Sequence, residues 1–462
     1  MREIKIIVEP FEFISFLSVN CVKELNEHGK IEIKGMISKD KVTEYQNMGY
    51  NETWVAVKLF NENNESMTFF NGILTELQIE KENQINILSI TVKTGSYLLD
   101  LIPHIRSYQK ASYTYDKILE DCLETDSGNF ILFDKQGINV NRFLMQYKET
   151  DWEFVKRLAG YAKVALVAED MFPGRNVYFG YPNSVKRKMM EADSYSVIQD
   201  YEEFQKRKNK NNNDITNNDI YLYKVKSREV YSLGETIIFQ GKRLVIGKII
   251  SCLTGQELQH TYFLRTKVMG TQIEEDNLNI IGASLKANVV NVDRTKVMIE
   301  IQSDENKNNT GNRWFDFATV YSTSDGTGWY CMPEIGDEVR LVFPDKCEES
   351  AYVSSCVHTE SESRTNPDEK SWKNKQGKEI IFTPESLILR NNKGMSIEIS
   401  DSEGIKVVSD KKVTIQAADD ISVSSEAGIQ MSAADSMLLS QGGASIRMND
   451  SITIGGGKIY MN

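Results

Sequence analysis

The fold of the C-terminal part is decided by residues 396–439, which read SIEISDSEGIKVVSDKKVTIQAADDISVSSEAGIQMSAADSMLL. Two apolar residues, separated by one residue, recur every eight positions, in the pairs Ile397/Ile399, Ile405/Val407, Val413/Ile415, Ile421/Val423, Ile429/Met431 and Met437/Leu439. This period does not fit a helical face, whereas it fits a short strand followed by a turn of about five residues. The octads therefore predict a β-solenoid with these twelve side chains as its inward-facing core.

Three more apolar pairs follow at the irregular spacings of nine, six and seven residues: Ile446/Met448, Ile452/Ile454 and Ile459/Met461. This loss of register predicts a taper at the tip of the solenoid. In one copy of such a thin repeat, the apolar surface that is buried stabilises the fold too little to offset the conformational entropy lost on ordering the chain. We therefore expect the octads to wind with copies of the same chain into a needle. The sequence does not exclude the alternative, a single-chain β-helix with three octads per coil.

Composition limits the remaining possibilities. A chain of 462 residues is too long for one core and predicts three or more domains. Its net charge of −12 argues against a nucleic-acid partner. The first ten residues, MREIKIIVEP, lack the apolar core of a secretory signal, and no apolar run approaches the ~20 residues that span a bilayer. We expect assembly in the cytoplasm, with the six cysteines as reduced core thiols.

Residues 1–275 read as one hub domain. Alternating apolar and polar residues predict β-barrels at about 1–100 and 161–275. An α+β insert at 101–160 lies between them, with one helix on the face of Ile118 and Leu119 and another that is capped by Thr150 and ended or bent by Gly160. The Asn- and Lys-rich stretch 205–219 predicts a mobile surface loop.

Residues 280–360 contain five or six short strands, which suit a small barrel of the oligonucleotide/oligosaccharide-binding (OB) type. This segment contains the motif GWYCMPEIGDEVRLVF at residues 328–343. Pro333 and Gly336 predict a tight turn between two strands, and the Asp337 side chain is expected to hydrogen-bond the backbone of that turn. Trp329 is expected to be a core or hub-contact anchor, the alternative being an aromatic platform for a base or sugar. A polar connector, 361–379, leads to the octad-repeat spike, 380–462.

Three stretches resemble one family. Residues 147–160, YKETDWEFVKRLAG, look like the hub-domain helix of VgrG and phage tail hub proteins. Residues 108–113, YQKASY, together with the helix that carries Ile118 and Leu119, resemble the helix before it in the same domain. The motif at 328–343 is similar to the signature of the family's small barrel. The resemblance implies a mainly β fold with a small α+β part: a hub of β-barrels with helices, an OB-type barrel and a C-terminal triple-stranded β-helix.

The resemblance further implies a homotrimeric hub and spike of a contractile injection machine: a type VI secretion apparatus, an extracellular injection particle or a phage-like tail. Implied partners are an Hcp-like tube protein, baseplate proteins, a PAAR-like tip protein or effector, and a target membrane that is pierced transiently. Delivery outside the cell or into a target cell would follow assembly. The tip that receives a partner is expected at Gly455, Gly456, Gly457, Lys458, Ile459, Tyr460 and Met461.

Enzymatic activity is not expected, because the chain holds no nucleophile-elbow, zinc-protease, EF-hand or Walker string. We also expect no cofactor and no metal, since none of the four histidines lies in the octads. The alternative function is a trimeric tailspike or adhesin that binds or cleaves surface polysaccharide. The repeat is thin for that role and carries no Trp or Phe after Phe382.

Overall fold

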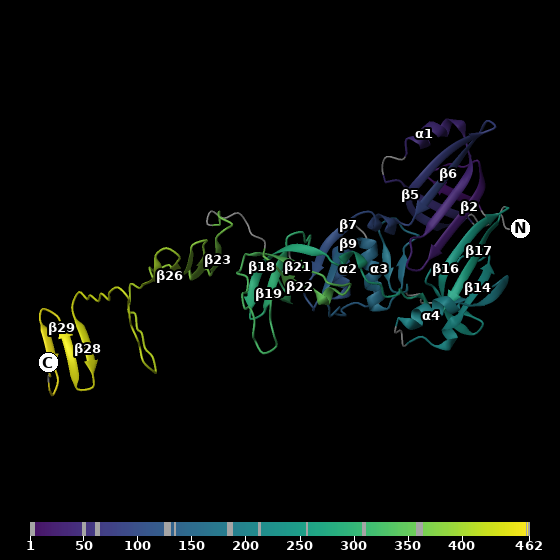
Figure 1. The fold of residues 1–462 in the computed structure, drawn as a ribbon. Coiled ribbons are helices and arrows are strands. Elements are labelled where there is room, and N and C mark those ends of the chain that lie inside the picture. Colours follow the sequence, from purple (N-terminus) through teal and green to yellow (C-terminus); the bar gives the residue numbers. More distant parts are fainter. Residues whose placement is uncertain are drawn as a thin grey trace. The chain divides into compact units, whose positions relative to one another are not determined.

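The computed structural model describes residues 5–48, 52–60, 65–123, 131–133, 135–182, 188–210, 214–255, 257–306, 311–356, 364–458 and 460. The chain divides into two compact units, Met1–His358 and Thr359–Asn462. The first unit contains both strand-rich segments, the insert and the small barrel, and the second contains the octads (Figure 1). No described helix is long and apolar enough to cross a membrane.

Both strand-rich segments belong to one 12-stranded sheet. The first contributes β1 (Lys5–Glu9), β2 (Ser15–Glu24), β3 (Lys30–Ile37), β4 (Trp54–Phe60), β5 (Ser66–Glu82) and β6 (Ile85–Lys93). The second contributes β12 (Lys188–Met189), β13 (Ser194–Gln199), β14 (Tyr221–Ser227), β15 (Thr236–Phe239), β16 (Lys242–Thr254) and β17 (Glu257–Arg265). The order is β1-β4-β5-β6-β3-β2-β16-β17-β14-β13, with β15 and β12 branching from β16.

The pairing of β2 with β16 joins the two segments, with Cys21 opposite Ser251. Among the described strands the pairing is therefore one continuous path through both segments that were predicted as barrels. Strand β16 is 13 residues long, and β15 pairs with it only at residues 242–245, so residues 248–252 are open to β2. Each segment still has its own apolar core, one around Ile31 and Phe70 and one around Val245 and Tyr262.

The insert follows the predicted pattern. It contains β7 (Pro103–Tyr108), α2 (Tyr115–Leu123), β8 (Ile131–Phe133), β9 (Leu144–Thr150) and α3 (Asp151–Ala162), and β8 is paired with β11 (Val177–Phe179) and through it with β10 (Leu166–Ala168). All five apolar residues of the face of α2 are buried. Thr150 caps α3, as predicted, and it also forms a reciprocal capping box with Glu153.

Gly160 does not end α3, which continues to Ala162 and is ended by Lys163 in the left-handed conformation. A Cβ atom at Gly160 would lie 2.8 Å from the carbonyl oxygen of Ile273 and 2.9 Å from the Cα of Glu274. The residue is therefore a point of close backbone approach, and the prediction of a helix end there is wrong.

The predicted loop at 205–219 is largely ordered. Helix α4 (Tyr201–Asn209) begins at Asp200, whose side chain accepts from the Glu203 amide, and it buries Phe204 and Arg207. A short helix at Asn217–Ile220 follows, and residues 211–213 lie outside the described part. The helix was not predicted from the sequence because its N-cap residue and its buried Phe204 precede the Asn/Lys-rich stretch, whose composition is typical of a loop. Other short helices are α1 (Val42–Gln46) and α5 (Lys267–Gly270), with single turns at Lys39–Lys41, Gly95–Asp100, Leu278–Ile280 and Glu348–Ser350.

The small barrel consists of β18 (Ser284–Asp293), β19 (Lys296–Ile301), β20 (Trp314–Asp316), β21 (Glu338–Val342) and β22 (Tyr352–Ser354), in the order β20-β19-β18-β21-β22. A bridge between Phe317 and Val353 joins the two outer strands. Val339 and Leu341 alternate along β21, and they and the following Phe343 are fully buried. Five closed strands around one core confirm the predicted OB-type barrel.

The second unit is made of two antiparallel meanders. The first contains β23 (Lys370–Lys373), β24 (Glu379–Phe382), β25 (Ser386–Arg390), β26 (Ser396–Ser400) and β27 (Gly404–Val408). The second contains β28 (Met437–Gln441), β29 (Ala444–Met448) and β30 (Ile452–Gly455). Residues 409–436 between them are described throughout and form no strand.

Candidate functional site

The octad pairs line up across neighbouring strands. Ile397 lies opposite Val407 and Ile399 opposite Ile405, while Met437 lies opposite Met448 and Leu439 opposite Ile446. A shift of one residue would place one partner on the other face, so this register keeps each apolar pair together. We define the apolar ladder as the twelve predicted core residues from Ile397 to Leu439. Six of them pair in strands, and the other six lie in residues 409–436, which form no strand.

The apolar ladder is not buried within the single chain, which differs from the core that the octads predict. Met437 is half-buried, and the other eleven members are exposed. These eleven are Ile397, Ile399, Ile405, Val407, Val413, Ile415, Ile421, Val423, Ile429, Met431 and Leu439. The physical reason is that one copy of the repeat forms flat meanders and a segment without strands, so it encloses no shaft.

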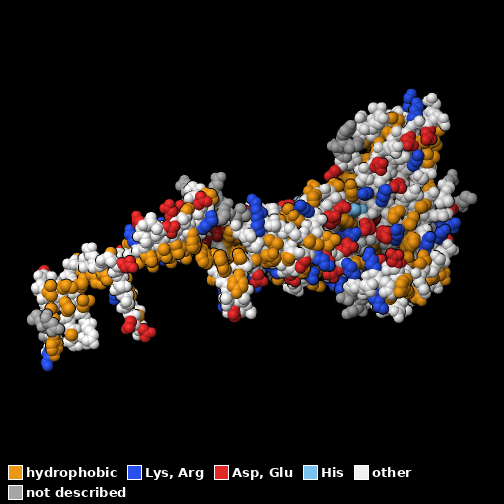
Figure 2. Space-filling model, in the orientation of Figure 1, with side chains coloured by type: hydrophobic (Ala, Val, Ile, Leu, Met, Phe, Trp, Pro, Cys, Tyr) orange, Lys and Arg blue, Asp and Glu red, His pale blue; other side chains and the backbone are white. Residues whose placement is uncertain are grey.

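The exposure is greatest where the chain has no strands. There the exposed fractions run from 54 % for Ile429 to 78 % for Ile415, with 65 % for Val423 and 62 % for Met431. Figure 2 shows hydrophobic side chains gathered along this unit. A contiguous exposed apolar surface of this kind marks an interaction site. A single-chain core is therefore wrong for the ladder, and its inward orientation in an assembly of several chains stays a prediction.

The motif of the small barrel forms the predicted turn. Gly336 has a φ of +96°, its amide donates to the carbonyl of Val289, and the Asp337 carboxylate accepts from the Glu334 amide at 2.8 Å. Pro333 lies in the loop before β21. Trp329 is 54 % exposed and is not part of the core of its own chain. The expectation that it is a core residue is therefore wrong. Its role as an anchor for another surface stays a prediction.

The predicted tip residues follow the last strand. Gly455 ends β30 opposite Ser445, and Gly456, Gly457, Lys458 and Tyr460 are exposed. Ile459 and Met461 lie outside the described residues. No partner at this end is tested, so the assignment of the tip stays a prediction. Among the described residues no group of three His, Cys, Asp or Glu side chains could hold a metal ion.

A second feature, not found from the sequence, is the joint between the insert and the small barrel. We define the joint as the buried contacts that helix α3 and strands β7 and β9 make with residues 302–350. Its apolar part is shared: Phe143 and Met145 of the insert belong to the core of the barrel. The Phe143 ring lies 5.4 Å from that of Phe315 and 6.3 Å from that of Phe343.

Arg157 is the centre of the polar part of the joint. Its guanidinium donates to both carboxylate oxygens of Glu149, at 2.8 and 2.7 Å, and to Glu348 at 2.6 Å. It also donates to the carbonyl of Met145 at 3.0 Å. Burial alone would lower the pKa of Arg157, but the two carboxylates outweigh it and raise that pKa. The guanidinium therefore remains charged and paired although only 3 % of its side chain is exposed.

The loop between β19 and β20 completes the joint by capping the free edge of β7. The Ser107 amide donates to Asp304 at 3.0 Å and the Ile105 amide to Glu305 at 3.0 Å, while the Glu305 amide donates back to the Ile105 carbonyl at 2.9 Å. Asn306 adds a bond to the Ser107 carbonyl at 3.2 Å. These bonds satisfy backbone groups that would otherwise form an open edge.

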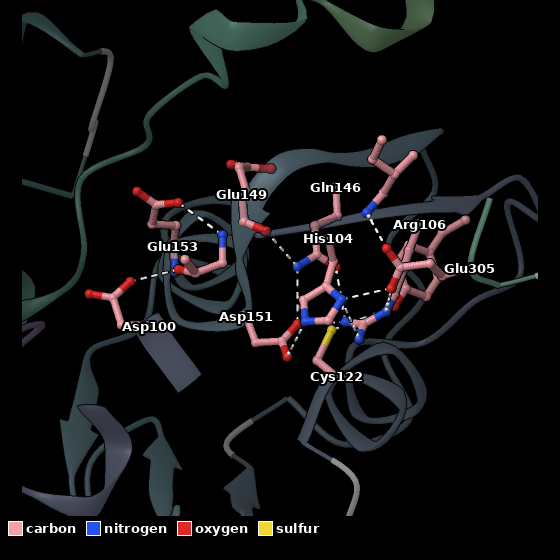
Figure 3. A network of polar contacts seen from close by, with 12 residues as sticks. Asp100, His104, Arg106, Cys122, Gln146, Glu149, Asp151, Glu153 and Glu305 are labelled. Atoms are coloured by element: carbon pink, nitrogen blue, oxygen red, sulfur yellow. Dashed lines mark hydrogen bonds and ion pairs between the residues drawn. The ribbon is translucent and has the colours of Figure 1, made fainter. Parts of the chain in front are cut away.

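Charged side chains surround this capped edge (Figure 3). His104 lies 2.7 Å from Glu305 and 3.5 Å from Asp151, and Arg106 donates to Asp151 at 2.5 Å and to Gln146 at 3.2 Å. Cys122 is the one thiol in this view, and burial raises its pKa to about 12. A thiol held in its protonated form is a poor nucleophile. The ion pairs of His104 and Arg106 link strand β7 to helix α3 and to Glu305 of the small barrel.

The cysteines are all free, in agreement with the predicted reduced state. Cys21 and Cys122 are buried, and Cys252 is half-buried. The description as core thiols is wrong for Cys331, Cys347 and Cys356, which are exposed. The reason is that these three lie in loops or beyond the last strand of the small barrel, outside its apolar core.

The small barrel has a sequence match. Residues 285–358 match the family described as "Type VI secretion system/phage-baseplate injector OB domain". No curated protein matches the chain in sequence.

Solved structures extend the likeness beyond the small barrel. A chain of the half-lidded PdpA–VgrG complex from Francisella matches with a TM-score of 0.58 at 10 % identity. The match covers 88 % of this chain and 88 % of that one. The lidless form of the complex matches with a TM-score of 0.56 at 11 % identity, and the match covers 88 % of this chain and 98 % of that one. The Escherichia coli c3393 protein matches with a TM-score of 0.51 at 13 % identity, and the match covers 77 % of this chain and 100 % of that one. It is described as a component of the type VI secretion system that is structurally similar to the phage T4 tail proteins gp27 and gp5.

At these identities the structural matches establish the fold. Together with the sequence match of the barrel they confirm the predicted resemblance to the VgrG and phage tail hub-and-spike family.

Proposed function

We propose that this chain is one subunit of a homotrimeric hub and spike in a contractile injection machine. The observation that supports this most directly is the exposed apolar ladder, which continues through residues 409–436 where the single chain forms no strand. The backbone amides and carbonyls of that segment need partners if the segment is to be ordered. Strands from two further copies, placed in the same octad register, would supply those partners and cover the ladder.

The mechanical role follows from how the needle and the hub are built. A needle of inter-chain strands has few torsions free to bend, and so it transmits an axial push. The joint would carry this push between hub and barrel, because a shared core, a buried guanidinium and a capped strand edge resist separation. Hub strands would meet an Hcp-like tube protein and baseplate proteins, and the tip would receive a PAAR-like protein or an effector.

The proposed role needs no bond-breaking. The matched structures are described as a type VI secretion component similar to phage tail proteins and as complexes of PdpA with VgrG, which favours a non-enzymatic role for this chain. We propose assembly in the cytoplasm and delivery by the machine itself. The test is the mass of the full chain in solution, measured alongside release of sugars from cell-wall and capsular glycans. A trimer that releases no sugar supports the proposal, whereas a monomer, or sugar release lost on mutation of one carboxylate, contradicts it.

A further inference from the structure

The two strand-rich segments of the hub repeat one strand order. The first segment runs β1-β4-β5-β6-β3-β2, and the second runs β12-β15-β16-β17-β14-β13. Each segment contributes six described strands, so β13 takes in the second segment the place that β2 has in the first. In the same way β14 corresponds to β3, β16 to β5 and β17 to β6. Residues of the two segments can therefore be compared position by position.

The hairpins β5–β6 and β16–β17 match in detail. The register of β5 against β6 skips one residue, Thr75, and that of β16 against β17 skips Gly247. Beyond this bulge each hairpin continues for seven residue pairs. Counting from the bulge, Ile79 of β5 therefore corresponds to Ser251 of β16.

The same comparison relates β13 to β2. Cys21 of β2 lies opposite Ile31 of β3. Val197 of β13 lies opposite Tyr223 of β14. Ile31 and Tyr223 in turn pair with equivalent residues of β6 and β17, the ones that lie opposite the position just before the bulge. Val197 therefore corresponds to Cys21.

The chain joins its two segments through one pair of these equivalent edges. Cys21 of β2 lies opposite Ser251 of β16, and both side chains are buried. The corresponding edges are β13 and the end of β5, and in the described part of the chain neither has a strand on its outer side. Strand β13 ends the sheet, and β4 pairs with β5 only at residues 66–73. Val197, the counterpart of the buried Cys21, is 48 % exposed.

Strand β13 also lacks the protection that is usual at a free edge. Its sequence, SYSVIQ, has no charged residue and no proline, and all six residues are exposed. An unprotected edge of this kind pairs readily with another strand. On the other edge, Leu77 and Ile79 of β5 pack against the core of the first segment but are only half-buried. A strand added beside them would cover their side chains.

We propose that β13 of one copy pairs antiparallel with residues 77–82 of β5 in a neighbouring copy, repeating between chains the β2–β16 contact within the chain. The register transfers directly, so Val197 lies opposite Ile79 and Gln199 opposite Leu77. Because the contact joins two different edges, it repeats by rotation from copy to copy and closes into a ring. The inference rests on the proposed homotrimer. It adds to the needle a short contact within the hub.

A disulfide across the proposed strand pair tests this register. Full-length Ile79→Cys with Val197→Cys is made in a background of Cys331→Ser, Cys347→Ser and Cys356→Ser, which removes the exposed native thiols. Oxidised glutathione is the oxidant, and it is reduced as the two thiols join. Opposite residues of an antiparallel pair have Cα atoms about 4.5–5.5 Å apart, which a disulfide can span. We expect denaturing electrophoresis without reductant to show chains linked in twos and threes.

The matched control is Gln78→Cys with Val197→Cys in the same background. Residue 78 points to the opposite face of the sheet from residue 79, so this pair should not link above the level of the single-cysteine variants. If the main variant does not fold, Leu77→Cys with Gln199→Cys takes its place. That pair is the next one on the same face, and it has the same expected result.

The mass of the same samples before oxidation, measured by sedimentation, separates this inference from the proposed function. A trimer whose cysteine pair links supports both. A trimer whose pair links no more than the Gln78→Cys control overturns the β13–β5 pairing and leaves the hub-and-spike trimer in place. A monomer contradicts the proposed function itself, and the pairing with it.

Discussion

The Arg157 guanidinium lies 2.6 Å from Glu348, 191 residues away in the sequence, and ties helix α3 of the hub insert to the single turn Glu348–Ser350 of the small barrel. Both side chains are more than 90 % buried. Short-range sequence patterns do not reveal such a contact, yet it joins two parts of the first unit.

Glu348→Gln tests this contact. The variant leaves part of the Arg157 charge without its partner inside the protein, which costs on the order of 3–5 kcal/mol when a buried ion pair is broken. Chemical denaturation of the first unit within the full chain, followed by tryptophan fluorescence, measures the loss. Glu349→Gln is the matched control, because the neighbouring Glu349 is exposed and should change stability by less than about 0.5 kcal/mol. Equal effects of the two variants would show that the joint does not depend on this pair.

Gly160→Ala separates helix propensity from packing. In an open helix the change would stabilise the protein by about 1 kcal/mol. Here the added Cβ would meet the backbone of Ile273 and Glu274 at 2.8–2.9 Å, so we expect the variant to be destabilised. The free energy of unfolding in urea gives the sign directly, and a stabilised variant would rule out the close approach.

The hub should lose stability in acid through His28 and His260. Burial is the main cause that lowers the pKa of both imidazoles from 6.5 to about 4. A histidine whose pKa is lower in the folded state binds fewer protons there than in the unfolded chain. Its stability contribution is therefore complete above pH 6.5 and is lost as the pH falls from 6.5 towards 4.

The loss should be on the order of 2 kcal/mol per histidine at pH 4.5. Unfolding free energies measured between pH 7.5 and 4.5, for the native chain and for His260→Gln, provide the test. The variant lacks one titrating group and should show a shallower decline. Parallel curves for the two proteins would contradict a role for His260.

Much of the fold follows from local sequence patterns, and the remainder depends on contacts between distant segments. Strand periodicity, the capping box of Thr150 and the turn at Gly336 are short-range features, so they were predictable. The β2–β16 pairing and the Arg157–Glu348 contact join residues far apart in the chain, and no local pattern encodes them. Helix α4 was missed because its Lys/Asn composition resembles that of a loop, while its cap and its buried Phe204 precede the biased stretch.

The octads show a different limit of sequence patterns. Their period identifies which side chains form a common apolar row, but it does not say whether one chain or several cover that row. Val423 and Met431 illustrate this, because both fit the period and both are exposed in the single chain. The single chain does not enclose these apolar side chains, and the sequence pattern does not identify the surface that would cover them.

The needle can be tested by two charged substitutions. Ile421→Asp with Ile429→Asp would bury unpaired carboxylates in a three-chain shaft, at a cost of several kcal/mol for each layer. The matched control is Ser422→Asp with Gln430→Asp, which changes the residues between the ladder positions by the same charge. We expect the first variant to lose its oligomer or its heat resistance, and the second to keep both. Equal behaviour of the two would mean that the apolar ladder does not face inward.

The mass of the full-length chain by sedimentation equilibrium tests the central claim most directly. The hub-and-spike account predicts a single species with three times the chain mass of 52.7 kDa. It also predicts that fewer chains associate when residues 396–462 are removed or when apolar ladder residues are replaced by Asp. A species of 52.7 kDa that is unaffected by loss of the octads would contradict it.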